Sequence, residues 1–117
     1  MTLQEIYSML CTILPVEKVT YRAFPVNEAP ELPYIIYFEG PSDNMSADNQ
    51  VYAPVMELNI EVYFDIEKGK DPALEALIEN TLNEYGLVWA KDEEVIDSEN
   101  MIEVIYTTEV IRNGRSE

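Results

Sequence analysis

The chain has 117 residues and a formal net charge of −16, because 23 Asp and Glu residues outnumber 7 Lys and Arg residues. A chain of this length can bury one hydrophobic core but not two, and a hydrophobic content of 47% is typical of a folded domain. The negative charge excludes ordinary nucleic-acid binding, which depends on neutralising phosphates with Lys and Arg.

Few side chains are available for catalysis. Histidine is absent and Cys11 is the only cysteine, which excludes intrachain disulfides, Cys/His zinc sites, His-based triads and Cys-His dyads. This composition favours a binding protein over an enzyme, and we expect no cofactor. The chain start lacks the pattern of a signal peptide, and no apolar run is long enough to span a membrane, so we expect a cytoplasmic protein in which the cysteine stays reduced.

A helix is predicted over residues 3–14. Thr2 and Glu5 have the spacing of a capping box, in which each side chain satisfies a backbone N–H group at the helix start. Apolar residues then recur at intervals of three and four, which places them on one helix face. Pro15 is expected to end the helix.

Two strands are predicted next, separated by a stiff loop. Residues 18–24 alternate in the manner of a strand, and residues 25–33 contain three prolines that cannot donate ladder hydrogen bonds. Tyr34–Glu39 is almost continuously apolar, which predicts a strand with both faces covered.

A long polar loop at 41–50 precedes the clearest strand. The loop is longer than a tight hairpin needs, which is typical of a functional segment. After it, apolar and polar residues alternate strictly up to Asp65, so one face is expected in the core and the other in water. The predicted core residues are Met56, Leu58, Ile60, Val62 and Phe64.

A second helix is predicted to begin at Asp71–Pro72 and to end at Gly86. Asp71 can accept hydrogen bonds from the first turn, Pro72 suits the first helical position, and Gly86 suits the left-handed cap. The predicted buried stripe is Leu74, Leu77, Ile78 and Leu82, and the predicted solvent face is Glu75, Glu79, Asn80, Asn83 and Glu84.

The last third of the chain predicts a short strand at 87–90, a turn at 92–94 and a long strand at 101–111. We therefore expect a single α+β domain over 1–111, with element order α-β-β-β-α-β-β and two helices on one face of a mainly antiparallel sheet. Residues 112–117 are expected to form a flexible tail.

Two groups of oxygen-bearing residues are candidate sites. Asp43, Asn44, Asp48 and Asn49 could suggest a calcium loop, but they lack its spacing, central glycine and trailing glutamate, so we expect a solvated loop without metal. On the third strand, Glu57, Glu61 and Asp65 recur at every fourth position. Neighbours in this series lie about 13 Å apart, too far for a catalytic pair, so we expect a solvated strand face.

Acidic residues and tyrosines suggest interfaces. The acidic cluster formed by residues 92–94, Asp97 and Glu99 either meets a basic partner or keeps the protein soluble. Tyrosine is enriched at protein interfaces. Of the eight tyrosines, Tyr52 and Tyr63 fall beside the long loop or on the polar strand face, where they serve either in an interface or as half-buried sheet residues.

Several segments, in the same order along nearly the whole chain, carry a resemblance to one protein family. The segments are Leu32–Tyr37, Ser42–Asn49 with Val51 and Tyr52, Lys70–Glu75 and Asp97–Met101, and none of them is catalytic. Together they resemble the small tail-completion proteins (also called head-tail joining proteins or tail terminators) of siphophages and prophages of Gram-positive bacteria.

The resemblance implies a non-enzymatic protein of the virion neck, assembled in the host cytoplasm, that caps the tail tube and docks it on the head connector. Such proteins form rings, generally hexamers, through which DNA passes, so the implied partners are further copies, the tail tube protein and the head-completion protein. A carboxylate-lined channel would repel DNA and let it slide. Long strands and an extended loop suit assembly, and the expected contact residues are Asp43, Asn44, Met45, Asp48, Asn49, Tyr52, Glu61 and Tyr63.

Two other hypotheses stay open. The first is a cytosolic adaptor or inhibitor whose acidic surface binds a basic protein, and the second is an enzyme that uses carboxylates alone. An adaptor would lose affinity steeply as salt rises, whereas a tail protein would bind tube ends through apolar and backbone contacts.

Overall fold

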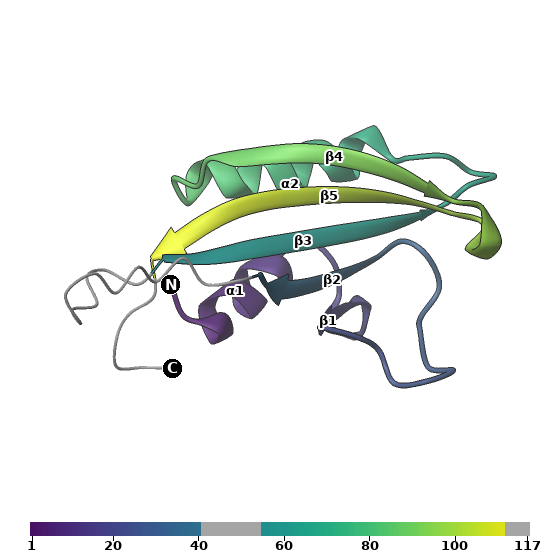
Figure 1. Ribbon diagram of the computed structural model, residues 1–117, viewed down its shortest axis with the longest axis horizontal. Coiled ribbons are helices and arrows are strands. Elements are labelled where there is room, and N and C mark those ends of the chain that lie inside the picture. The colour runs from purple at the N-terminus through teal and green to yellow at the C-terminus, as the bar shows by residue number, and fades with distance from the viewer. Residues whose placement is uncertain (41–54, 112–117) are drawn as a thin grey trace.

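The computed structural model describes residues 1–40 and 55–111 of the chain. Two helices and five strands follow one another in the predicted order, so the expected α+β fold class is confirmed (Figure 1). Short 3-10 turns at Val16–Lys18 and Asp97–Glu99 precede β1 and β5. The bounds are α1 Leu3–Leu10, β1 Val19–Tyr21, β2 Tyr34–Glu39, β3 Val55–Asp65, α2 Pro72–Glu84, β4 Trp89–Ile96 and β5 Met101–Ile111.

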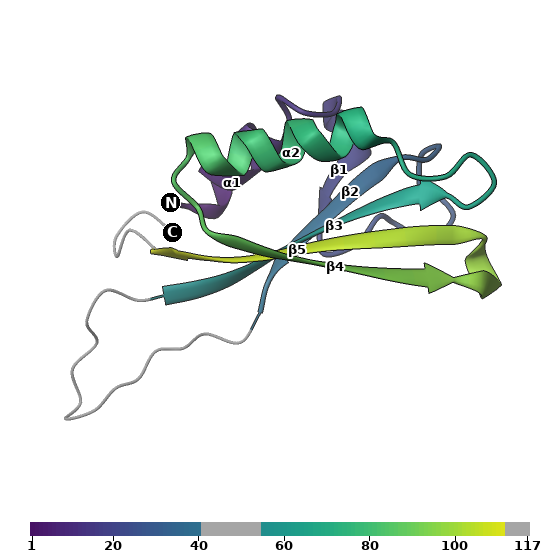
Figure 2. The same ribbon diagram turned by 90° about the horizontal axis from the view of Figure 1, so that it is seen from above.

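The strands form one sheet in the order β1-β2-β3-β5-β4. Only β1, which runs parallel to β2, departs from the antiparallel arrangement. The two central strands, β3 and β5, stay in register from Val55 opposite Ile111 to Asp65 opposite Met101. Both helices lie on the same face of this sheet (Figure 2).

The hydrophobic core lies between that face and the helices. The predicted inward residues of β3 are all at most 2% exposed, which confirms the alternation. Ile6 and Leu10 of α1 and Ile78 and Leu82 of α2 are fully buried and belong to the same apolar cluster. Amphipathic helices and a sheet with one apolar face stabilise each other by this burial.

Helix α1 begins as predicted and ends early. Glu5 N–H donates to Thr2 Oγ1 at 3.1 Å, and Thr2 N–H donates to Glu5 Oε1 at 2.8 Å, which completes the capping box. The helix ends at Leu10, because the next turn tightens and Thr12 N–H donates to the carbonyl three residues back. The approach to Pro15 also disfavours helical backbone.

The first two strands also depart from expectation. β1 ends at Tyr21, earlier than predicted, because Arg22 takes a left-handed φ of +71° that turns the chain. β2 has the predicted bounds, but Ile36 and Phe38 are only half-buried. In the described part of the chain the helices cover one face of β2, so the expectation of two covered faces is wrong.

Helix α2 has the predicted ends. Asp71 accepts hydrogen bonds from the N–H groups of Ala73 at 3.0 Å and Leu74 at 3.4 Å. Pro72 occupies the first turn, and Gly86 follows the helix with a φ of +73°. These are the local signals that start and stop helices, and they act here as expected.

The faces of α2 are rotated from the prediction at two positions. Glu75 is only 7% exposed although it was assigned to solvent, and Leu77 is 45% exposed although it was assigned to the buried stripe. Both assignments are wrong. The Glu75 side chain points towards the sheet, where its carboxylate forms an ion pair with the partly exposed Lys91 of β4. Helix α2 therefore lies with its Glu75 side over β4.

The prediction of a turn at residues 92–94 is wrong. These acidic residues lie in the middle of β4, and the chain turns at Asp97–Glu99, followed by Asn100 with a left-handed φ of +55°. Pairing with β5 overrides the local preference of acidic residues for turns. Charged residues are also common on strands at the edge of a sheet, where β4 lies.

Two predicted segments, the loop at 41–50 and the tail at 112–117, lie outside the described residues. Neither described helix is long and apolar enough to cross a membrane. The predicted contact residues Asp43, Asn44, Met45, Asp48, Asn49 and Tyr52 also lie outside the described residues.

Candidate interaction surface

The sheet face opposite the helices is the first candidate surface. No helix of the described ranges covers it, and we call it the open face (Figure 2). Residues paired directly across a sheet share a face. The residues of the open face can therefore be identified from the strand register, one row of paired residues at a time. One row is Tyr34, Tyr63, Glu103 and Glu94, the next is Ile36, Glu61, Ile105 and Asp92, and a third is Phe38, Asn59, Thr107 and Ala90.

Two carboxyl groups meet one tyrosine near the start of β5. The Tyr63 hydroxyl oxygen lies 2.7 Å from Glu61 Oε1 and 2.9 Å from Glu103 Oε2. One hydroxyl can donate to only one of these oxygens, so the other hydrogen bond needs a proton on a carboxyl group. Two simultaneous hydrogen bonds in the cluster of Glu61, Tyr63 and Glu103 would therefore require two protons among the three side chains.

Glu103 is the carboxyl group best placed to hold the second proton. Its side chain is only 6% exposed, and burial together with the adjacent Glu61 raises its pKa, although the Tyr63 hydrogen bond acts in the opposite sense. Burial and the two glutamates also raise the pKa of Tyr63, which keeps its hydroxyl protonated. Protonation of Glu103 would lower the repulsion within the open face.

Sequence spacing could not reveal this cluster. Glu57, Glu61 and Asp65 are spaced along one strand as expected, but Glu61 meets a carboxyl group from the neighbouring strand. All three are half-buried on the open face, so the strand face that was expected to be solvated is only partly exposed at these positions. The missing information was the pairing of Tyr63 with Glu103, which depends on the register between β3 and β5.

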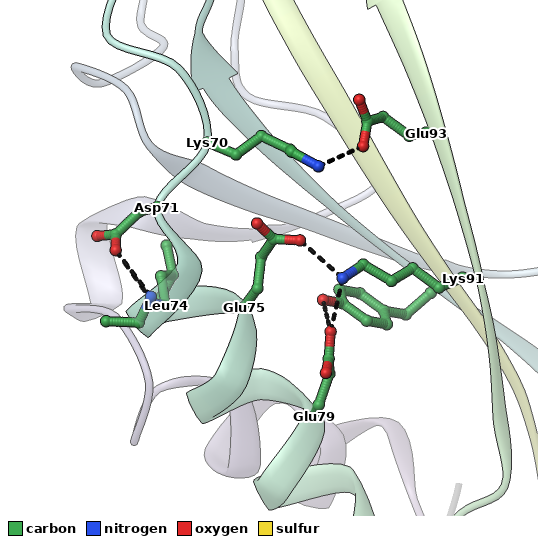
Figure 3. Close-up of polar contacts among 9 residues, drawn as sticks. Lys70, Asp71, Leu74, Glu75, Glu79, Lys91 and Glu93 are labelled. Atoms are coloured by element: carbon green, nitrogen blue, oxygen red, sulfur yellow. Dashed lines mark hydrogen bonds and ion pairs between the residues drawn. The ribbon is translucent and has the colours of Figure 1, made fainter.

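The charged side chains on the helix-facing side of β4 form ion pairs with groups of opposite sign. Lys91 Nζ lies 2.7 Å from Glu75 Oε1 and 2.8 Å from Glu79 Oε2, and Lys70 Nζ lies 2.5 Å from Glu93 Oε1 (Figure 3). Hydrogen bonds with the two α2 glutamates raise the pKa of Lys91. The Lys91 ion pairs connect β4 to α2, and the Lys70 ion pair connects β4 to the segment that precedes α2.

The side chains of β4 on the open face carry negative charge without ion pairs in the described part of the chain. Asp92 and Glu94 are exposed, and neither forms an ion pair within the part of the chain that the structure describes. They are members of the acidic cluster noted in the sequence. The strand thus carries paired charges on one side and uncompensated negative charge on the other.

Three segments of the family resemblance meet at one end of the sheet. Leu32–Tyr37 enters β2, Lys70–Glu75 begins α2, and Asp97–Met101 connects β4 to β5 (Figure 1). The Tyr34 hydroxyl donates to Met101 Sδ at 3.7 Å, and a hollow of about 320 Å³ is lined by residues that include Pro33 and Lys70. The fourth segment lies outside the described residues.

The chain was compared with protein-family models and with curated proteins. No family model matches the chain, and no curated protein is similar to it. Within the described residues, no group of three or more Cys, Asp or Glu side chains is arranged to hold a metal ion.

Proposed function

We propose that this protein is a structural component of a phage tail, which caps the tail tube and joins it to the head connector as a ring. The observation that carries the proposal is the open face, a broad surface of four strands without a helix over it in the described ranges. Long strands with a free face suit contacts between subunits and with a tube end. DNA would pass through the ring, and no membrane is involved.

The open face combines apolar and acidic groups. Ile36, Phe38 and Ile105 are half-buried in the single chain, and covering them with a neighbour would add roughly 25 cal/mol per Å² of apolar area. The acidic side chains oppose this gain, because each subunit carries a net charge of −16. Isolated subunits should therefore associate weakly, and a tail end should template the ring.

The sheet end that gathers the resembling segments supports the same role. A shared contact between Tyr34 and Met101 holds two of these segments together. Segments that are distant in sequence thus form one surface of the molecule. This surface is suited to a second contact in the virion neck, with the head-completion protein.

Electron microscopy with tail tubes tests the proposal. A matching tail tube protein would be polymerised alone, with the wild-type protein, or with the charge reversals Glu109→Arg and Glu84→Arg. Glu109 is exposed on the open face, whereas Glu84 is exposed on α2, so the variants are matched in charge and exposure.

Wild-type protein and Glu84→Arg should form rings at tube ends and limit tube length, while Glu109→Arg should do neither. Tubes that grow without a cap in the presence of wild-type protein would overturn the proposed function. Equal activity of the two variants would remove the open face from the mechanism.

The second candidate is an acidic adaptor or inhibitor that binds a basic protein. The uncompensated charges of Asp92 and Glu94 are the observation that favours it. Binding that weakens steeply between low and moderate salt would support the adaptor, because exposed charge pairs are screened. Tube capping that persists at moderate salt would support the tail protein.

A further inference from the structure

Strand β4 forms one edge of the sheet, and its backbone direction can be traced from known hydrogen bonds. Gly40 N–H donates to the Glu57 carbonyl, so odd-numbered residues of β3 direct their backbone groups to β2 and even-numbered residues direct theirs to β5. Val62 lies opposite Val104, so even-numbered residues of β5 point to β3 and odd-numbered residues point to β4.

The same alternation assigns the outer edge of β4. Asp92 lies opposite Ile105, so its backbone N–H and C=O groups point to β5. The backbone groups of Lys91, Glu93 and Val95 therefore point away from the sheet. Glu93 N–H donates to the Asp92 side chain at 2.8 Å, as expected for an amide outside the ladder. No strand of the described ranges 1–40 and 55–111 pairs with this edge.

The opposite edge is a poorer template for another strand. β1 has only three residues, and the Tyr21 carbonyl already accepts a hydrogen bond from Ala23 N–H at 2.8 Å. β4 is eight residues long, and all its residues are exposed or half-buried. The available edge is therefore at β4.

The side chains of β4 indicate what kind of strand could pair with it. Lys91 and Glu93 project to the helix side, where ion pairs with α2 and Lys70 neutralise them. On that side Val95 is 53% exposed and offers an apolar contact. Asp92 and Glu94 project to the open side, where an added strand would need positive charge opposite them.

A second copy of β4 fits this edge badly. In a continuous antiparallel sheet, residues that pair directly must share a face, so two copies would place Asp92 opposite Asp92, or Glu94 opposite Glu94, or, in the register between these, Glu93 opposite Glu93 with Asp92 opposite Glu94. Each choice sets like charges opposite one another. The net charge of −16 on each chain adds to this repulsion.

We propose that β4 accepts an extended, basic segment of a partner protein as an additional strand of the sheet. The segment carries Lys or Arg at every second position, facing Asp92 and Glu94 on the open side, and uncharged residues at the positions between them. Main-chain hydrogen bonds to the backbone groups of Lys91 and Val95 and to the Glu93 carbonyl supply binding, and the alternating charge supplies selectivity. This inference goes beyond the tail role and does not depend on it.

The first test uses the full chain and the peptide Thr-Lys-Thr-Lys-Thr-Lys-Thr with blocked ends. Titration followed by NMR at low salt should show binding to wild-type protein, and the amide hydrogens of Lys91 and Val95 should exchange more slowly when the peptide is bound. A peptide with Glu in place of Lys should not bind. Protection of these amides without peptide, together with dimer formation, would instead show pairing between copies and overturn the proposal.

Two variants separate backbone pairing from simple charge attraction. Val95→Pro removes an outward amide without breaking the ladder with β5 and should abolish binding, while Val95→Thr keeps the amide and should bind normally. Asp92→Lys combined with Glu94→Lys should weaken binding by about tenfold or more. Thermal melts would show that each variant folds.

Equal peptide affinity of Val95→Pro and Val95→Thr would mean that only surface charge attracts the peptide, and would overturn the proposal. Unchanged amide exchange of Lys91 and Val95 in the bound wild-type protein would overturn it independently of any variant. Absence of peptide binding to wild-type protein would do the same. Failure of tube capping would leave all these outcomes unaffected.

Discussion

The two faces of β3 are stabilised in different ways. On the helix side, the alternating apolar residues are at most 2% exposed and pack in a continuous core. On the open side, the polar residues are half-buried and satisfy one another, as Glu61, Tyr63 and Glu103 do. The comparison shows that one strand is buried by apolar packing on one face and held by polar contacts on the other, which no helix of the described ranges covers.

The largest effect is expected where a charge enters the core. Ile60 is fully buried on the helix side, so Ile60→Asp should lower the free energy of unfolding by more than about 4 kcal/mol and unfold the domain. Ile60→Val, the matched control, should cost about 1 kcal/mol. Thermal melts measure both, and wild-type stability of Ile60→Asp would show that the face assignment of β3 is wrong.

Truncation of Leu82 and Leu77 compares the buried and exposed sides of α2. Leu82 is fully buried, and Leu82→Ala should cost about 2–5 kcal/mol. Leu77 is 45% exposed, and Leu77→Ala should change stability by less than about 0.5 kcal/mol. Denaturant titrations measure both values, and equal costs would favour the buried stripe that the sequence predicted.

The ion pairs under β4 should contribute less than the core. Lys91→Met keeps much of the apolar stem and leaves Glu75 and Glu79 without their cation. We expect a loss of about 1 kcal/mol, because Lys91 is partly solvent-screened although Glu75 is buried. Lys18→Met, which removes a cation without a described ion pair, is the control and should be nearly neutral. Equal stabilities of the two variants would contradict this role of Lys91.

Glu103 on the open face should make the stability of the protein depend on pH. The pKa of Glu103 is raised by burial and by Glu61, so the folded state holds its proton more tightly than the unfolded state does. This contribution to stability is fully present below the ordinary carboxyl pKa and is lost as pH rises through the raised folded-state pKa. Tyr63 and Glu94 are the other titratable groups facing Glu103.

Urea titrations across this pH window should show wild-type protein losing stability relative to Glu103→Gln as pH rises. Glu79 provides a contrast of opposite sign: burial raises its pKa, but hydrogen bonds from Lys91 and Tyr106 outweigh burial and lower it. Wild-type protein should therefore lose stability relative to Glu79→Gln as pH falls through the lowered folded-state pKa. Parallel pH profiles for wild-type and Glu103→Gln would show that Glu103 does not hold the shared proton.

Local signals in the sequence were sufficient for the helix starts and the main strands. The capping box at Thr2, the Asp71–Pro72 start and the alternation of β3 act through groups close in sequence, so they could be predicted. The apolar spacing predicted too late an end for α1. The helix ends at Leu10, because the following residues form a tighter turn in which Thr12 N–H donates to the Met9 carbonyl.

The candidate surfaces depended on contacts between distant parts of the chain. Acidic residues 92–94 predicted a turn, but pairing with β5 made them an edge strand. The Glu61–Tyr63–Glu103 cluster required the register of β3 with β5, and the burial of Glu75 required its ion pair with Lys91 across two elements. Cross-strand pairing and helix packing are stabilised by contacts between residues that are distant in the sequence. These residues meet only in the folded chain, so local sequence patterns do not predict the contacts.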